Sequence, residues 1–308
     1  ADDGREWLGG DPGRVPSSTA REPLSLAEPT PPRPDDSIAL ILDLADRLRR
    51  ESIERGSRPV GLGVVVPGQV DVEAGVAVYS ANLGWRDVPF ARLLADHTGL
   101  PTRLGHDVTA GGIAELTYGG HELAAARNSV VLQLGTGIAG VVVSDGTLLV
   151  GAGGLAGEIG HIPVHPGGEE CPCGQRGCLE RYASAAPVGR RYAAAGGAPG
   201  ATSADVVRLR GTDAVAARVW HEAVEALALA IATATMLLDP SLVVFSGGLS
   251  AAGEELVGPV RSALADKVVW RQAPSVVASA LGPQVGLAGA SITAWHAAGH
   301  EAPAEWIG

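Results

Sequence analysis

Aromatic residues and cysteine are scarce in this chain of 308 residues, which contains two Phe, four Tyr and three Cys. Because apolar residues nevertheless make up 46% of the sequence, the core must be built mainly from Val, Leu, Ile and Ala. All three cysteines lie between positions 171 and 178, which leaves none elsewhere to form a disulfide. We therefore expect a reduced, cytoplasmic protein.

An excess of positive charge is also lacking, since the formal net charge is −11. An acidic chain repels phosphate backbones and anionic lipids, which argues against nucleic-acid and membrane partners. Residues 1–10 contain no apolar segment typical of a signal peptide. The longest apolar run, Ala226–Leu238, is about half as long as a membrane-spanning helix and predicts a buried helix.

Strands and helices are expected to alternate along the chain. An apolar run over 60–66 predicts a strand buried on both faces, and helical spacing from Ile38 to Leu48 predicts a helix that Asp36 or Ser37 would cap. Further helices are expected at 88–97, 107–116, 213–238 and 289–298, and further strands at 102–105, 129–134, 138–143 and 242–245. Because strands run into glycine-rich turns in both halves of the chain, we expect an α/β protein with two lobes and a cleft.

The most specific motif is Cys-Pro-Cys-Gly-Gln-Arg-Gly-Cys at 171–178. Zinc prefers four ligands in a tetrahedron, and closely spaced thiolates on turns formed by Gly174 and Gly177 can supply three of them. We expect a zinc site with the ligands His161, Cys171, Cys173 and Cys178. His165 is an alternative fourth ligand, and free thiols or a redox pair are the alternative to zinc. Four protein ligands leave no open position, so the zinc would be structural.

Carboxylates stand near this motif and at one strand end. Glu158 and Glu180 flank the cysteine segment. If a metal holds this loop rigid, both carboxylates are fixed in place and could accept hydrogen bonds from a hydroxyl-rich ligand. The alternative is that they only contact water, as most surface glutamates do. Asp107 closes the segment Leu-Gly-His-Asp at 104–107, which ends a strand and starts a helix. It could accept a proton from a substrate hydroxyl, or it could simply cap the helix that follows.

Two glycine-rich turns could approach a nucleotide. Gly135, Thr136 and Gly137 join two strands, where backbone amides and the Thr hydroxyl could contact phosphate; an ordinary hairpin turn explains the same residues. Gly247 and Gly248 follow the strand at 242–245. They could allow the backbone to run close beside a nucleotide, or they could simply start a helix.

Taken in order, these motifs resemble the ROK family of sugar kinases and sugar-responsive repressors, over roughly residues 60 to 295. The matching segments are Val65–Asp71, Asn82–Trp85, His106–Asp107, Leu134–Ile138, Gly157–His161, the cysteine motif through Glu180, and Val244–Gly248. The resemblance implies the two-lobed actin-like ATPase/hexokinase fold, which is ribonuclease H-like. The small α/β lobe would be 1–105, joined by a C-terminal helix at 289–300. The larger α/β lobe would be 106–288, with the zinc loop at 157–180.

The resemblance also implies roles for single residues. Asp107 would be the base that takes a proton from the 6-hydroxyl of a sugar. The sugar would be bound by Asn82, His106, Glu158, His161 and Glu180. Gly135, Thr136 and Gly137 would face the ATP phosphates, and Gly247 and Gly248 the adenosine, with Mg²⁺ and ATP as cofactors beside structural Zn²⁺. A homodimer or homotetramer is expected from the same likeness.

Two positions depart from the family pattern. Where these kinases have an Asp-x-Gly-Gly-Thr phosphate loop, the counterpart by spacing is Trp7–Asp11, in which Trp replaces the acid and Asp the hydroxyl. His106 stands where the sugar kinases have Asn, which points to a substrate other than plain glucose. We therefore expect a kinase for a hexose or hexose-like polyol, such as an amino sugar or cyclitol, with ATP or polyphosphate as donor. The alternatives are a non-catalytic sugar-binding protein and, less favoured by the charge, a DNA-binding protein.

Overall fold

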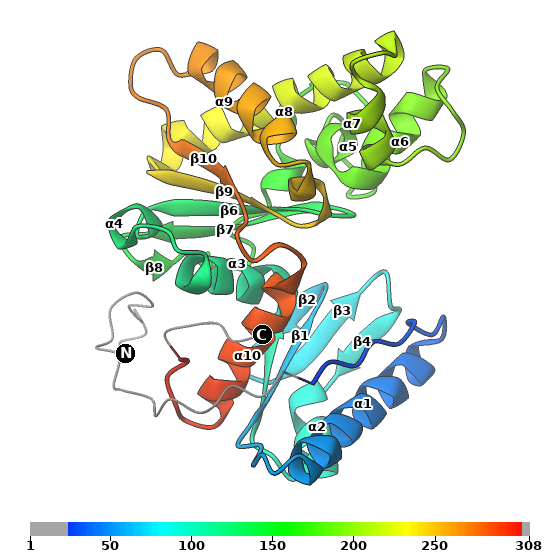
Figure 1. The fold of residues 1–308 in the computed structure, drawn as a ribbon, viewed down its shortest axis with the longest axis vertical. Coiled ribbons are helices and arrows are strands. Elements are labelled where there is room, and N and C mark those ends of the chain that lie inside the picture. The colour runs from blue at the N-terminus through cyan, green and yellow to red at the C-terminus, as the bar shows by residue number, and fades with distance from the viewer. Residues whose placement is uncertain (1–23, 304–308) are drawn as a thin grey trace. The chain divides into compact units, whose positions relative to one another are not determined.

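A computed structural model describes residues 24–303, which divide into two compact units (Figure 1). The large unit comprises residues 115–283, and the small unit comprises residues 24–114 and 284–303. Within the described residues the chain passes between the units after Ala114 and after Pro283. The lobe boundary expected after residue 105 precedes helix α3 (Asp107–Tyr118), whereas the compact units divide within that helix. The segment Trp7–Asp11 lies outside the described residues.

The small unit contains two sheets. Strands β1 (Leu62–Val66) and β5 (Thr102–His106) pair in parallel. The second sheet is antiparallel and consists of β2 (Gln69–Asp71), β3 (Val76–Ser80) and β4 (Trp85–Val88). The helices of this unit are α1 (Pro34–Glu54), α2 (Phe90–Thr98), α10 (Val285–Ala297) and the first part of α3. The core cluster includes Trp85, Phe90, Leu94 and Leu104, all nearly or fully buried.

Helix α10 lies directly against β1 because the strand contains glycine. A Cβ atom on Gly63 would lie 2.0 Å from the carbonyl oxygen of Ala290 in α10, closer than any side chain allows. Glycine usually weakens a strand, but here it permits a close backbone approach. The last helix of the described residues therefore packs on their first strand.

The expected cap of α1 was wrong. The helix begins at Pro34, at the first-turn position that proline favours, so Ser37 lies inside it. The Ser37 hydroxyl donates to the Pro34 carbonyl oxygen at 2.7 Å and accepts from Trp85 Nε1 at 2.9 Å. Ser37 therefore satisfies a buried indole of β4, a contact between distant positions that helix-start patterns do not reveal.

The large unit is built on one five-stranded sheet in the order β10–β9–β6–β7–β8. The strands are β6 (Ser129–Leu134), β7 (Ile138–Ser144), β8 (Thr147–Leu148), β9 (Leu242–Ser246) and β10 (Ser275–Ala278). The pairs β6–β9 and β9–β10 are parallel, and β6–β7 and β7–β8 are antiparallel. The alternating α/β order predicted from the sequence is confirmed.

Helices α8 and α9 pack side by side on one face of this sheet (Figure 1). The helices of the large unit are α4 (Leu123–Ala126), α5 (Glu180–Ala183), α6 (Ala185–Ala194), α7 (Ser203–Leu209), α8 (Ala214–Leu238) and α9 (Glu254–Lys267). Short 3₁₀ turns occur at η1 (Ile159–His161), η2 (Gly248–Ala252) and η3 (Gly282–Gln284). Among the described residues, α8 alone has the length and composition of a membrane span. It has 13 buried residues, 11 of which belong to the core cluster of this unit, as the sequence predicted for a buried helix.

Candidate functional site

The four predicted metal ligands lie together in the large unit. The ligand atoms of His161, Cys171, Cys173 and Cys178 all lie within 4.8 Å of one another. His165, the alternative fourth ligand, is not in this group; its ring packs instead on Tyr182, with ring centroids 4.3 Å apart. Three sulfurs and one imidazole nitrogen form a donor set that suits zinc in a closed, tetrahedral site. The residues present therefore fit a structural zinc ion.

The loop that carries these ligands turns at glycines. Gly174 and Gly177 have φ values of 92° and 80°, in the left-handed region that glycine adopts without strain. At Gly177 a Cβ would also lie 1.8 Å from the His165 carbonyl oxygen. These two glycines bring the thiols of one short segment to one point, as their spacing predicted.

The thiol cluster favours a bound cation for an electrostatic reason. Burial, together with the neighbouring Cys171 and Cys173, raises the pKa of the Cys178 thiol to about 12. Three thiols at this separation become thiolates together only when a positive charge offsets their repulsion. A divalent metal supplies that charge and releases the protons as it binds.

The two ring nitrogens of His161 face different groups. Nδ1 lies 3.9 Å from the Cys171 sulfur, on the side of the metal cluster. Nε2 lies 3.6 Å from a carboxylate oxygen of Glu158, whose side chain is 47% exposed. The imidazole can therefore hold a metal with one nitrogen and present the other, beside a carboxylate, to a ligand.

The segment before His161 is fixed against strand β7. The Gly140 amide donates to the Gly157 carbonyl oxygen at 2.7 Å. A Cβ on Gly160 would lie 2.0 Å from the Ile138 carbonyl oxygen. Only glycine therefore allows the backbone at position 160 to approach β7 this closely. Glu158 and His161 thus project from backbone that rests directly on the sheet.

Glu180 connects the end of the cysteine segment to the first glycine-rich turn. Its Oε2 atom accepts a hydrogen bond from the Ile138 amide at 3.0 Å. On the same turn, the Gly135 carbonyl oxygen accepts from the amide of Ala185, the first residue of α6, at 3.0 Å. The contact of Glu180 with Ile138 was not predicted; the only sequence signal was that Ile138 directly follows the Gly-Thr-Gly turn.

The second glycine-rich turn lies beside the first. Strands β6 and β9 are parallel neighbours, so the turns that follow them leave the same edge of the sheet. Gly247 adopts a φ of 81°, and a Cβ there would lie 2.8 Å from the Leu134 carbonyl oxygen at the end of β6. In open α/β sheets this carboxyl edge is where ligands bind. The large unit thus gathers Gly135–Gly137, Gly247, Gly248 and Glu180 along one edge.

The small unit carries the remaining predicted residues. Asp107 is the first residue of α3, and its Oδ1 atom accepts from the Val108 amide at 2.8 Å. His106 lies with Nε2 3.4 Å from Asp107 Oδ1 and with Nδ1 3.3 Å from the Thr109 hydroxyl. Asn82 is exposed in the turn between β3 and β4. One carboxylate oxygen of Asp107 supports the helix start, so capping and a chemical role are compatible.

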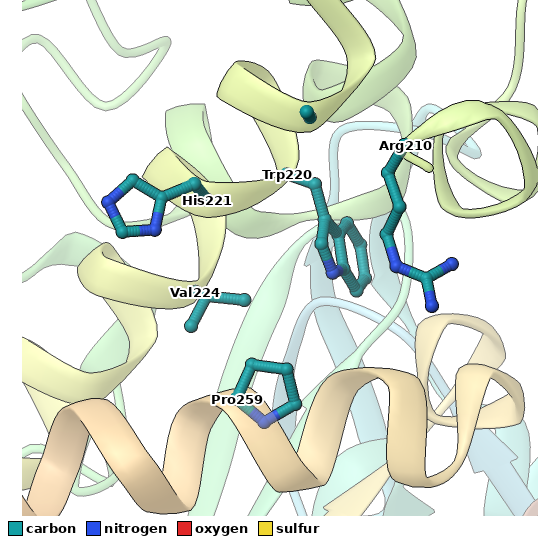
Figure 2. Close-up of a pocket in the computed structure, with 6 residues that line it drawn as sticks. Arg210, Trp220, His221, Val224 and Pro259 are labelled. Atoms are coloured by element: carbon teal, nitrogen blue, oxygen red, sulfur yellow. The ribbon is translucent and has the colours of Figure 1, made fainter. Parts of the chain in front are cut away.

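A shallow cavity of about 210 Å³ in the large unit contains none of these residues (Figure 2). It lies between α8 and α9, and its lining residues are Arg210, Ala217, Trp220, His221, Val224 and Pro259. Trp220 Nε1 donates to the Glu255 carbonyl oxygen at 3.2 Å, an acceptor left free because Pro259 has no amide proton. Arg210 is paired with the Glu255 carboxylate. The cavity therefore offers a ligand few unsatisfied polar groups.

Comparison with known proteins defines the class. The ROK family profile matches residues 23–297. A glucokinase of Thermotoga maritima is 36% identical over 78% of this chain and 80% of its own length. A kanosamine kinase of Amycolatopsis mediterranei is 33% identical over 87% of each chain. The chain belongs to the ROK family.

Solved structures agree with this assignment. A ROK family glucokinase from Streptomyces griseus, in complex with glucose and AMPPNP, has a TM-score of 0.73 at 28% identity and covers 87% of this chain and 90% of its own. A ROK family transcriptional regulator, a homolog of an Escherichia coli MLC protein, has a TM-score of 0.76 at 25% identity and covers 86% of this chain and 69% of its own. The predicted family and its hexokinase-like α/β fold are confirmed, and the chain is glucokinase-like.

Proposed function

We propose that this protein is an ATP-dependent kinase that phosphorylates a hydroxyl of a hexose or of a hexose-like polyol. The observation that carries the proposal is the arrangement of Glu158, His161 and Glu180 on one cysteine loop. Two of these side chains offer carboxylate oxygens, and His161 has one nitrogen directed toward Glu158 rather than toward the metal cluster. Fixed acceptors of this kind suit a ligand rich in hydroxyl groups. The glucokinases and the kanosamine kinase among the relatives support the same class of substrate.

Asp107 supplies the base in this proposal. It begins α3, and the Val108 amide donates to its Oδ1 atom, which leaves Oδ2 for a substrate hydroxyl. Phosphoryl transfer requires mainly positioning and neutralisation of charge, so one carboxylate that accepts the hydroxyl proton is sufficient. ATP with Mg²⁺ supplies the phosphoryl group when bound, and the turn Gly135–Gly137 would receive its phosphates through backbone amides. Gly247 and Gly248, on the same sheet edge, would face the nucleoside.

The zinc ion has a supporting role here. It would be held by four protein side chains and so has no open position for a reactant. Its effect is to keep the loop between Glu158 and Glu180 in one conformation, which lowers the entropy lost when a sugar binds. Thiolate ligands need a reducing compartment, and we propose the cytoplasm. A homodimer or homotetramer remains our expectation for the assembly.

The substrate class is tested by an ADP-release assay over hexoses, amino sugars and cyclitols at high Mg²⁺ and ATP. Turnover with one group supports the kinase and identifies the substrate. A parallel series with polyphosphate in place of ATP identifies the donor. Absence of turnover with every acceptor and both donors would contradict the proposal.

A non-catalytic sugar-binding protein is the second candidate. Two points favour it: by spacing alone, Trp7 and Asp11 are the counterparts of the acid and the hydroxyl in the phosphate loop of the family kinases, and a ROK transcriptional regulator is among the structural relatives. Titration calorimetry separates the two candidates. Sugar binding without any binding of ATP would support the second candidate, whereas ATP binding in the presence of sugar would support the kinase.

A further inference from the structure

Glu115 is a fully buried carboxylate for which the proposed chemistry has no use. Its side chain is 0% exposed, although it lies only eight residues after Asp107 on the same helix, α3. A buried charge is costly unless it is well hydrogen-bonded. The partners of Glu115 therefore indicate what the charge is for.

Both carboxylate oxygens of Glu115 bind one segment that lies far away in the sequence. Oε2 accepts from the Ser279 hydroxyl at 2.5 Å and from the Leu281 amide at 3.4 Å, and Oε1 accepts from the Ala280 amide at 2.9 Å. Ser279 also accepts from the amide of Gly282 at 3.0 Å, which orders the rest of this connection. One side chain thus holds three consecutive residues between β10 and α10.

His121 completes the set of partners. Its Nε2 atom donates to Oε1 of Glu115 at 3.1 Å, and its side chain is 11% exposed. The return of the chain toward Glu115 depends on Gly119, where a Cβ would lie 2.5 Å from Oε1 and 2.7 Å from His121 Nε2. Burial alone would raise the pKa of Glu115, but the hydrogen bonds from His121, Ser279, Ala280 and Leu281 outweigh it and lower the pKa below its ordinary value. Glu115 is therefore an anion at neutral pH.

The two segments joined by Glu115 are the two through which the described chain passes between the units. One passage follows Ala114 within α3, and the other follows Pro283, just before α10. Within the small unit, α3 and α10 are in close contact. A Cβ on Gly289 of α10 would lie 2.5 Å from the carbonyl carbon of Ala110 in α3. The two passages are thus held together on the large-unit side by Glu115 and on the small-unit side by Gly289.

We propose that Glu115 is a positioning residue for phosphoryl transfer, since it joins α3 and residues 279–281 in one joint and thereby fixes the helix that begins at Asp107. Asp107 stands about 12 Å along the helix from Glu115, so a change in the direction of α3 moves its carboxylate by a distance that matters to catalysis. This inference rests on the proposed kinase function. Three of the five proposed sugar-binding residues, Glu158, His161 and Glu180, belong to the large unit, whereas the proposed base Asp107 belongs to the small unit, so the joint should affect turnover more than sugar binding.

The test compares Glu115→Ala and Glu115→Gln with a control variant, Leu227→Ala. Leu227 is a fully buried residue of the large-unit core cluster, to which neither connecting segment contributes. Turnover per folded molecule, the sugar dissociation constant from calorimetry and the zinc content are measured for each. We expect kcat of Glu115→Ala to fall on the order of tenfold or more, with the sugar dissociation constant within about threefold of wild type. The kcat of Glu115→Gln, which keeps one acceptor oxygen, should lie between the kcat of Glu115→Ala and that of wild type. Leu227→Ala should keep the wild-type kcat.

The proposal is overturned if kcat of Glu115→Ala stays within about twofold of wild type, or falls only in proportion to the folded fraction. If the wild-type chain phosphorylates no acceptor, the kinase function itself has failed, and the joint is then tested by small-angle scattering of the ligand-free protein. A larger radius of gyration for Glu115→Ala than for wild type and for Leu227→Ala supports the joint. An unchanged radius overturns it.

Discussion

The Oε2 atom of Glu180 accepts a hydrogen bond from the amide of Ile138, 42 residues earlier, at 3.0 Å. This contact joins Glu180, two residues after the cysteine motif, to the residue that follows the Gly-Thr-Gly turn. A side chain proposed to bind sugar is therefore supported by the turn proposed to receive phosphate. The contact makes the glycine at position 137 critical, because no other residue leaves room for the carboxylate.

A methyl group at position 137 should displace Glu180. In Gly137→Ala the new Cβ would lie 2.6 Å from Glu180 Oε2, which is closer than a Cβ approaches other atoms. We expect the KM for the sugar to rise about tenfold or more, as when a charged hydrogen bond is lost. The matched control is Gly153→Ala, where a Cβ meets no atom within 4 Å. Equal KM values for the two variants would contradict the proposed role of the contact.

Loss of one thiol ligand should release the metal. Cys173→Ser is expected to lower the metal content from one zinc per chain to nearly none and to reduce the temperature of unfolding, because structural zinc contributes on the order of 10 kcal/mol of binding free energy in small domains. Metal analysis and thermal denaturation followed by circular dichroism measure the two effects. Glu170→Gln, at an exposed position of the same loop, should keep its zinc. Less than one zinc per wild-type chain would refute the metal site.

Asp107→Asn separates catalysis from capping. An Asn oxygen can still accept from the Val108 amide, so the start of α3 should be preserved. Without a base, kcat should fall by roughly 10²- to 10⁴-fold, while the sugar dissociation constant stays within a few-fold. Steady-state kinetics and calorimetry provide the two numbers. A loss of binding as large as the loss of turnover would refute the assignment of Asp107 as the base.

His106 should influence which sugar is preferred. Its ring nitrogens lie near Asp107 and Thr109, so the imidazole cannot offer a donor and an acceptor to the same edge of a sugar as an amide does. We expect His106→Asn to raise kcat/KM for glucose relative to the best substrate of the wild type, by about fivefold or more. Competition assays with the two sugars measure the ratio directly. A ratio that does not change would show that His106 does not select the substrate.

The carboxylate of Glu115 should make stability depend on pH. Its pKa lies below the ordinary value of 4.5, so the folded state favours the anion. The stabilisation is complete above pH 4.5 and is lost as the pH falls through the lower pKa of the folded state. Near neutral pH, Glu115→Gln should be less stable than wild type by about 1–3 kcal/mol, and the difference should shrink in acid. Urea unfolding at several pH values measures the difference in unfolding free energy between wild type and Glu115→Gln. A difference that does not change with pH would contradict an ionised Glu115.

Local patterns predicted much of the large unit. The strand at 129–134 was expected with the observed bounds, and the helix at 213–238 and the strand at 242–245 each differ from the structure by one residue. These elements are buried, so their apolar runs are long and are bounded by turn residues. The antiparallel sheet of β2, β3 and β4 was not predicted, because its strands are short and their exposed and buried residues do not alternate regularly.

The sequence by itself determined the family, the α/β class and the four candidate metal ligands. Ligand spacing and glycine turns act over a few residues, so such features can be recognised without the fold. Three contacts were decided only by the tertiary structure. Glu180 accepts from the Ile138 amide, the Ser37 hydroxyl accepts from the Trp85 indole, and Glu115 binds the segment at 279–281. Each of these contacts joins positions far apart in the chain, and the desolvation that makes a buried hydrogen bond matter exists only after the chain has folded.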